Sequence, residues 1–293
     1  MAVLIDPPSW PAHGTVFSHL VSTSSLGELH AFAEAAGITR RAFDEDHYDV
    51  PARRYRELVA LGAREVSGTE LVRALIGSGL RVPARRRGPK LRAALTSRWA
   101  ALLPRDIALG DELLDRWAEE HREYHTPTHL LAVLEALDGL LEPADDPLRE
   151  PVLLAAWFHD AVYEGVAGSD ERASAALAVE LLNGTTAPDV VHEVERLVLL
   201  TITHDPASGD RAGELLCDAD LAVLAGSPAD YARYTAAVRA EYAHVPEAAF
   251  ATGRAEVLRR LLALEPLYRT PRAAEQWTAP ARRNLTAELA SLG

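Results

Sequence analysis

The segment 81–90 (RVPARRRGPK) constrains the fold more than any other feature, because the periodicity of apolar residues differs on its two sides. Its prolines and glycine interrupt regular structure, and its five basic side chains favour solvent. We therefore expect a basic linker at 83–90 between an N-terminal domain at 1–82 and a second domain at 91–293. A chain of 293 residues suits two domains, at about 100–200 residues per domain.

Before the linker, short apolar runs alternate with segments that carry helix-start signals. Ser25 and Glu28 have the spacing of a capping box, and Asp49 followed by Pro51 is typical of a helix start. The expected strands cover 2–5, 41–44 and 63–66, and the expected helices cover about 25–36, 49–61 and 69–76. This order, βαβαβα, predicts a small parallel α/β domain.

After the linker, apolar residues recur at helical spacing and strand signals are few. The expected helices cover 91–103, 109–121, 127–140, 149–163, 170–183, 188–202, 214–225, 228–242, 247–263 and 273–291. The second domain is therefore predicted to be all-α.

The charge and the cysteine content indicate which partners and which cellular compartment to expect. The formal net charge is −13, and the acidic excess lies after residue 90, so nucleic acid is an unfavoured partner. No run approaches the roughly 20 apolar residues of a membrane span, so we expect no membrane partner. The single cysteine, Cys217, and the lack of a secretory leader favour a cytoplasmic protein. The sequence leaves the oligomeric state open, and a homo-oligomer is one of the alternatives.

Histidine and aspartate residues interrupt three apolar helical segments. His129, His159, Asp160 and Asp220 together offer two imidazoles and two carboxylates, and buried carboxylates are costly unless they are paired or bind metal. Mixed nitrogen and oxygen donors suit one or two divalent ions of Mn, Fe, Co, Ni, Mg or Zn. The same residues are equally compatible with a buried His–Asp hydrogen bond, or with a carboxylate that faces water at a helix end.

Three motifs in order carry a resemblance: Tyr-His-x-x-x-His at 124–129, Trp-Phe-His-Asp at 157–160 and Asp-x-Asp-Leu at 218–221. They resemble the HD superfamily of metal-dependent phosphohydrolases, and the likeness covers about 92–291. Further matching elements are Glu171-x-x-Ser-Ala, Thr201-x-x-His, Arg239-x-Glu-Tyr, Gly253-Arg and Ala281-Arg-x-Asn-Leu. The resemblance implies an all-α HD-type domain that hydrolyses a phosphate ester by metal-activated water.

The resemblance also implies roles for individual residues. His129, His159, Asp160 and Asp220 would bind metal, His125 would be the proton donor, and Asp160 would also serve catalysis. The Ala-Asp-Leu pattern favours Asp220 over Asp218 as ligand. Candidates for a second ion or for orienting the ligands are Asp218, His204, Glu164 and Glu171. Candidates for binding phosphate are Arg122, Arg239, Arg254 and Arg282, although a surface salt bridge explains any one of these arginines as well.

The expected substrate is a small phosphorylated metabolite, foremost a nucleotide. Two alternatives remain open at this point. One is an HD-type oxygenase with two irons, to which His125 and His204 would contribute ligands. The other is a nucleotide-binding sensor without catalysis.

The N-terminal domain has a candidate site of its own. Ligands of parallel α/β folds bind at the carboxyl ends of the strands, where the predicted order gathers Asp6, His13, Asp46, His47 and Asp49. Helix capping by Asp49 and ordinary loop polarity explain these residues as well. Several segments, among them Asp-His-Tyr-Asp-Val-Pro at 46–51, resemble a small bacterial family of unknown function over about 2–82. That resemblance implies no activity.

Overall fold

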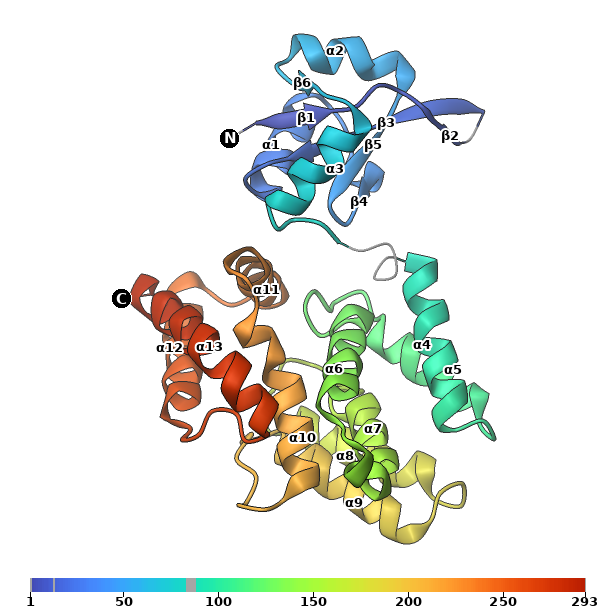
Figure 1. The fold of residues 1–293 in the computed structure, drawn as a ribbon, viewed down its shortest axis with the longest axis vertical. Coiled ribbons are helices and arrows are strands. Elements are labelled where there is room, and N and C mark those ends of the chain that lie inside the picture. The colour runs from blue at the N-terminus through green and yellow to red at the C-terminus, as the bar shows by residue number, and fades with distance from the viewer. Residues whose placement is uncertain (1, 13, 83–87, 293) are drawn as a thin grey trace. The chain divides into compact units, whose positions relative to one another are not determined.

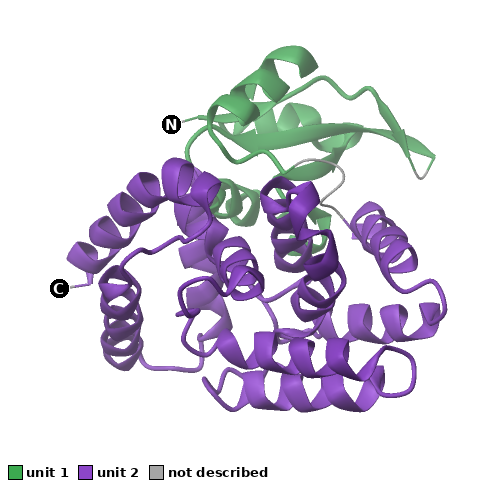
Figure 2. Cartoon of the chain, turned by 60° about the horizontal axis from the view of Figure 1, so that its bottom comes forward, with its two compact units in different colours: residues 1–87 green, residues 88–293 purple. Residues whose placement is uncertain are grey.

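The computed structural model describes residues 2–12, 14–82 and 88–292 (Figure 1). The backbone divides into two compact units, Met1–Arg87 and Gly88–Gly293, which Figure 2 colours separately. Most of the expected linker, 83–87, lies outside the described residues. Its last part, 88–90, forms the first turn of helix α4 (Gly88–Leu102).

The N-terminal unit is built on a mixed sheet with the strand order β4-β5-β3-β1-β6, and β2 pairs with β3. The strands are β1 (Val3–Ile5), β2 (Trp10–Ala12), β3 (Thr15–Ser22), β4 (Phe43–Asp44), β5 (His47–Pro51) and β6 (Arg64–Glu65). β1 is parallel to β6, whereas the other pairings of these strands within the described residues are antiparallel. The α/β class is confirmed, but the prediction of a parallel sheet is wrong, because β3 returns antiparallel to β1 in a stretch expected to be loop.

The second correction concerns the segment 47–54. Asp49 and Pro51 belong to β5 and do not begin a helix. A short 3-10 turn at Ala52–Arg54 follows, and the helix α2 (Tyr55–Ala60) begins only after that turn. The physical reason is the alternation of polar and apolar residues along β5, which places His47 and Asp49 on one face and Tyr48 and Val50 on the other.

Helices cover both faces of this sheet. Val3 and Ile5 of β1 pack on the side of α1 (Leu26–Ala35) and α2, and Leu4 packs on the side of α3 (Gly68–Gly77). The strand is buried on both faces, as its continuous apolar sequence predicts. Capping at Ser25 and Ser67 begins α1 and α3 near the predicted positions.

The second unit is helical, as predicted. Apart from an isolated bridge between Asn183 and Thr186, no strand occurs among residues 88–292. After α4 the helices are α5 (Ile107–Trp117), α6 (Pro127–Leu140), α7 (Asp146–Phe158), α8 (Asp170–Leu182), α9 (Pro188–Leu200), α10 (Arg211–Asp220), α11 (Pro228–Glu241), α12 (Glu247–Ala263) and α13 (Pro271–Ser291). Short 3-10 helices lie at Pro143–Asp145 and Leu221–Ala225.

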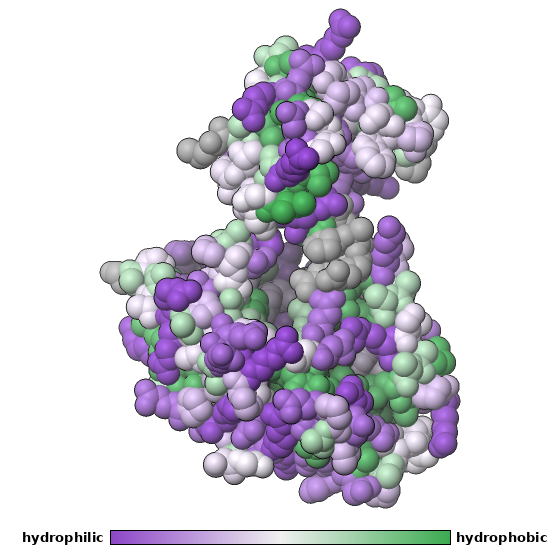
Figure 3. Space-filling view, viewed as in Figure 1, coloured by the Kyte–Doolittle hydropathy of each residue, from purple (hydrophilic) through white to green (hydrophobic). Residues whose placement is uncertain are grey.

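Three tryptophans anchor the core of the helical unit. Trp99, Trp117 and Trp157 are fully buried, and the rings of Trp99 and Trp157 meet edge to face with centroids 5.0 Å apart. The surface drawn in Figure 3 is mostly hydrophilic with small apolar patches. Among the described residues, no helix combines the length and the apolar character that a membrane crossing requires.

Gly110 of α5 gives a test of this packing. A Cβ at this position would overlap the indole ring of Trp99, so Gly110→Ala should lower the free energy of unfolding by about 2 kcal/mol through overpacking. The matched control is Gly253→Ala in α12, where a Cβ meets nothing within 4 Å. Alanine there should raise stability by roughly 0.5–1 kcal/mol, because glycine is the poorer helix former. Urea unfolding compares the two, and equal effects would contradict the packing described for Trp99.

Candidate functional site

Three helix ends meet in the helical unit and bring a cluster of histidines and aspartates together. His129 lies in the first turn of α6, two residues after Pro127, which begins the helix. α7 ends at Phe158, directly before His159 and Asp160, and Asp220 is the last residue of α10. The histidine and aspartate side chains that interrupt the apolar segments therefore lie together, where the ends of α6, α7 and α10 meet.

Three of the four predicted metal ligands, His129, His159 and Asp220, lie within contact distance of one another. The fourth, Asp160, contacts the two histidines, with its Oδ2 3.8 Å from His129 Nε2. His129 Nε2 lies 3.3 Å from His159 Nε2 and 3.1 Å from Asp220 Oδ1. His159 Nε2 lies 3.1 Å from Asp160 Oδ2 and 3.5 Å from Asp220 Oδ1. Both imidazoles are buried and both carboxylates are largely so, which makes this a compact set of nitrogen and oxygen donors.

Electrostatics within this cluster are strong. Burial lowers the pKa of His159, but the charges of Asp160 and Asp220 outweigh burial and raise it well above its usual value. Burial raises the pKa of Asp220, but the charge of His159 and hydrogen bonds with the histidines hold it well below its usual range. The pKa of Asp160 is lowered for similar reasons. The site is therefore poised to carry paired charges in a buried setting.

His125, the predicted proton donor, precedes α6 and is held by Glu241 at the end of α11. Its Nδ1 donates to Glu241 Oε2 over 2.7 Å, and its backbone N–H donates to Glu241 Oε1 over 3.1 Å. Tyr163 stacks on the imidazole with centroids 4.2 Å apart. His125 Nε2 faces the cluster, 3.9 Å from Asp160 Oδ2.

Glu241 is a residue of the candidate site that the sequence reasoning missed, although the Arg239-x-Glu-Tyr element contains it. It also accepts from the backbone N–H groups of Glu123 and Tyr124. Burial raises the pKa of Glu241, but the hydrogen bond and charge of His125 outweigh burial and lower it to about 2. Burial lowers the pKa of His125, but Asp160 and Glu241 outweigh it and raise this pKa. The pair therefore favours a protonated His125.

His204 also reaches the cluster. Its Nε2 lies 2.7 Å from Asp220 Oδ2, whereas His129 contacts the other carboxylate oxygen, Oδ1. The backbone of His204 is left-handed, with φ of 53°, a conformation that residues other than glycine seldom adopt. The position is thus compatible with either predicted role, orienting Asp220 or binding a second ion.

Asp218 lies outside the cluster. Its carboxylate accepts from the backbone N–H groups of Arg269 and Thr270 and from the Thr270 hydroxyl. Burial raises its pKa despite these hydrogen bonds. The structure therefore distinguishes the two aspartates: Asp220 contacts the histidines, and Asp218 holds the segment before α13.

The two glutamates proposed as orienting residues are placed differently. Glu164 is exposed, and its backbone N–H donates to Asp170. Glu171 accepts from the backbone N–H of Gly168 over 2.6 Å within the turn before α8. Among the described residues, no hydrogen bond or ion pair joins either carboxylate to the cluster.

The four arginines proposed for phosphate binding all have partners within the protein. Arg122 is buried and donates to the carbonyls of Asp160 and Ala161, so it supports the turn that carries the site. Arg282 donates to the carbonyls of Leu262 and Leu264. The other two pair with glutamates: Arg239 with Glu247, and Arg254 with Glu288. Their role in binding phosphate stays a prediction.

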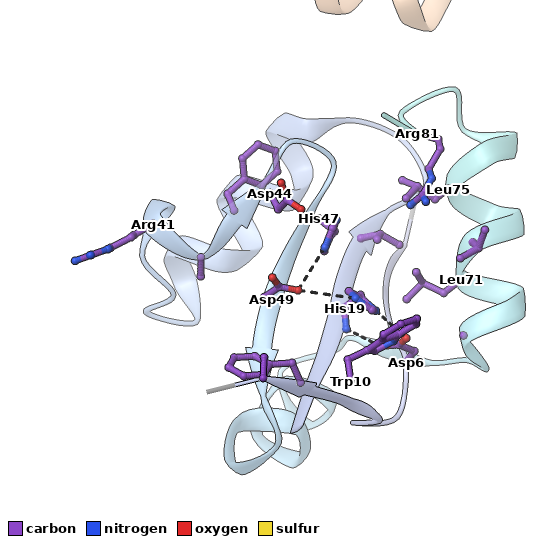
Figure 4. A pocket seen from close by; sticks show the side chains of 17 residues that line it. Asp6, Trp10, His19, Arg41, Asp44, His47, Asp49, Leu71, Leu75 and Arg81 are labelled. Atoms are coloured by element: carbon purple, nitrogen blue, oxygen red, sulfur yellow. Dashed lines mark hydrogen bonds and ion pairs between the residues drawn. The ribbon is translucent and has the colours of Figure 1, made fainter. Parts of the chain in front are cut away.

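A second cluster lies on the sheet of the N-terminal unit, on the face that α3 covers. His19 of β3 stands opposite Asp49 of β5, and His47 projects from the same face of β5. Figure 4 shows the three side chains directed toward one another. His47 Nε2 lies 3.4 Å and His19 Nε2 lies 3.9 Å from Asp49 Oδ1.

Each of these histidines is backed by a buried aspartate. Asp6, directly after β1, accepts from the Nδ1 and the backbone N–H of His19. Asp46 accepts from Nδ1 of His47 over 2.7 Å. Burial lowers the pKa of His47, but Asp46 and Asp49 outweigh burial and raise it to about 9.

The sequence prediction named four of the five residues in this arrangement. Asp6, Asp46, His47 and Asp49 gather as expected, whereas His13 lies outside the described residues. His19 was missed as a site residue because β3 was expected to be loop. The expected capping role of Asp49 is wrong, because it lies in β5.

A cavity of about 660 Å³ opens beside the second cluster. Apolar side chains from β3 and α3 form much of its wall, and Trp10, which is 57% exposed, stands against the His19 ring. Arg41, Asp44 and Arg81 also line it. The cluster is therefore accessible to a small molecule.

Comparison with known proteins finds one match, in the N-terminal unit. Residues 3–78 match the model of a family described as proteins of unknown function (DUF4031), which supports the predicted N-terminal domain of unknown function. No curated protein and no solved structure matches the chain. The likeness of the helical unit to the HD superfamily therefore rests on its motifs.

Proposed function

We propose that the helical unit hydrolyses a phosphate ester of a small metabolite, foremost a nucleotide, in a reaction that depends on a divalent metal ion. The observation that carries the proposal is the cluster of His129, His159 and Asp220, whose donor atoms lie within 4.8 Å of one another. Asp160 adds a fourth donor, 3.1 Å from His159 Nε2. The motif likeness to HD phosphohydrolases supports the same reaction and is the basis for the substrate class.

The donor set fits a cation. His159 donates its Nδ1 hydrogen to the Ala156 carbonyl over 2.8 Å, so a neutral ring turns its Nε2 lone pair toward Asp160 and Asp220. Facing acceptors repel one another unless a proton or a cation lies between them. Imidazole and carboxylate together suit Mn, Fe, Co, Ni and Zn, and Mg remains compatible with the carboxylates. When bound, such an ion supplies an activated water molecule and neutralises phosphoryl charge.

His125 is the residue of this chain that would move a proton. Water adds to phosphorus, the bond from phosphorus to the leaving oxygen breaks, and that oxygen takes the proton from His125 Nε2. Glu241 holds the ring from its other nitrogen and favours the charged form, which is what a proton donor requires. Tyr163 restricts the ring by stacking and also donates its hydroxyl to Glu241.

His125→Gln should lower kcat by about 100-fold or more, because general acid catalysis typically contributes a factor of about 10²–10⁴. The metal content should stay that of the wild type, since His125 Nδ1 is bound to Glu241 and the four ligands are untouched. The control is His192→Gln, on a side chain that is 82% exposed. Loss of metal in His125→Gln would contradict the assignment of His125 as acid and make it a ligand.

Two measurements test the proposed function. The first is the metal content of the protein after purification without a chelator, and the second is the release of phosphate from a panel of nucleotides and sugar phosphates. Mn²⁺, Mg²⁺, Co²⁺ or Ni²⁺ is added to each assay. Bound metal with turnover supports the proposal and begins to define the substrate. Nucleotide binding with metal but without turnover would favour a sensor, and absence of metal after supplementation would overturn the proposal.

A second candidate function is oxidation of a C–H bond at two irons. The position of His204 against Asp220 favours it, because a site for two ions needs more ligands than the four donors provide. Iron content and O₂ uptake distinguish the two reactions. Iron with O₂ consumption and no phosphate release would replace the hydrolase proposal.

A further inference from the structure

We propose that the N-terminal unit holds its own divalent transition-metal ion, bound by His19, His47 and Asp49, with open coordination positions that face the adjoining cavity. The inference concerns a site in a different unit from the proposed hydrolase site and does not depend on that function. It starts from the sheet, whose pleat directs all three side chains to one face.

The spacing of the donor atoms fits one ion. One nitrogen or oxygen atom from each residue lies within 4.8 Å of the other two. Ligand atoms about 2.0–2.2 Å from a single ion lie roughly 3–3.6 Å apart. Since His47 Nε2 and His19 Nε2 lie 3.4 and 3.9 Å from Asp49 Oδ1, small side-chain movements close the set.

The aspartates behind the histidines favour a metal over an ordinary polar contact. Asp6 and Asp46 are 2% and 0% exposed, and each accepts from the Nδ1 of one histidine. With Nδ1 as donor, a neutral ring presents the Nε2 lone pair to the space beside Asp49. The same carboxylate–histidine pairing orients the ligands of many metal sites.

Asp46 is itself held in place. Its Oδ2 accepts from the backbone N–H of Val82 over 2.6 Å and lies 3.8 Å from Arg81. Burial of this carboxylate is therefore compensated, and its orientation toward His47 is fixed. A carboxylate fixed in this way holds the His47 ring in the orientation that a metal ligand requires.

The open side of the site indicates the class of ligand. Three protein donors leave positions free on a four- to six-coordinate ion, the arrangement of metal sites that bind water or substrate. Trp10, Leu71 and Leu75 give the cavity an apolar wall, and Arg81 adds positive charge. A small organic anion that coordinates the ion through a carboxylate or phosphate oxygen suits these surroundings. Two imidazoles and one carboxylate suit Zn, Fe, Co, Ni or Mn.

The experiment uses the full chain and Co²⁺ as the probe. Protein freed of metal with chelator is dialysed against graded CoCl₂, and bound cobalt per chain is measured by mass spectrometry together with the visible absorption of the ion. Asp49→Asn and His19→Gln should each remove one cobalt equivalent relative to the wild type, or weaken its binding at least 10-fold. Asp6→Asn should weaken the same equivalent by about 10–100-fold.

Matched controls separate ligand loss from general effects. Asp44→Asn removes a carboxylate that lines the same cavity outside the cluster, and His30→Gln removes a histidine that pairs with Tyr48. Both should keep the wild-type cobalt content. Circular dichroism checks folding, and Asp49 is the decisive position because its side chain is partly exposed. Wild-type cobalt binding in a folded Asp49→Asn chain, or a loss that the controls share, would overturn the proposal.

Discussion

Asp220→Asn should reduce metal affinity and phosphate release at the helical site by more than about 100-fold. Changes behind a metal ligand already cost about 10–100-fold, so loss of a charged ligand should cost more. Asp220 also contacts three histidines directly: His129, His159 and His204. The variant therefore removes a negative charge that faces all three imidazoles.

The measurement combines metal content after dialysis with phosphate release at saturating metal. Asp205→Asn is a suitable control, because that carboxylate is exposed and pairs with Arg269, which is not a predicted metal ligand. The Asp220 variant should stay folded, since asparagine has nearly the same shape. Full metal content in this variant would show that Asp220 is not a ligand.

Asp218→Ala should have the opposite result. The substitution leaves the N–H groups of Arg269 and Thr270 and the Thr270 hydroxyl without their acceptor. Unpaired buried donors cost about 1–3 kcal/mol each, and partial access to water reduces the sum, so we expect a loss of about 3 kcal/mol in the free energy of unfolding. The metal ligands are untouched, and metal content of the folded fraction should match the wild type.

Urea unfolding measures this effect, and Asp218→Asn serves as its partner variant. Asparagine keeps one acceptor oxygen and should restore part of the lost stability. The two aspartates are thus separated by two readouts, metal content for Asp220 and stability for Asp218. If Asp218→Ala instead lost metal at unchanged stability, the assignments of the two residues would have to be exchanged.

The helices were predictable because their periodic signal is long. Segments such as 127–140, 228–242 and 247–263 repeat an apolar face over several turns, and the observed helices follow them closely. The prediction that His129, His159, Asp160 and Asp220 bind metal came from the motifs that resemble the HD superfamily. The structure brings these side chains close to one another.

The strands of the N-terminal unit carried a weaker signal. β3 places Ser18 and Ser22 among its buried positions and His19 on the cavity side, so polar residues occur on both faces and obscure the alternation. β5 ends in Pro51, which resembled a helix start. The first error led to the omission of His19 from the site, and the second gave Asp49 a capping role that it does not have.

Contacts between residues distant in sequence were also out of reach. The hydrogen bond between His125 and Glu241 joins residues 116 positions apart, and nothing in the local pattern of either segment announces it. The partners of Arg122 and Arg282 are backbone carbonyls, which no side-chain motif reveals. Sequence patterns located the donors of the cluster, but not the groups that hold them.

The meeting of three helix ends has a thermodynamic consequence. Since the ends of α6, α7 and α10 come together only when the helices pack, the unfolded chain has no preformed binding site. An ion that binds the folded state alone at 100 times its Kd would add about 2.7 kcal/mol to stability. Occupancy of the cluster and the melting temperature of the helical unit would then rise and fall together, so that a chelator acts on this unit as a mild denaturant.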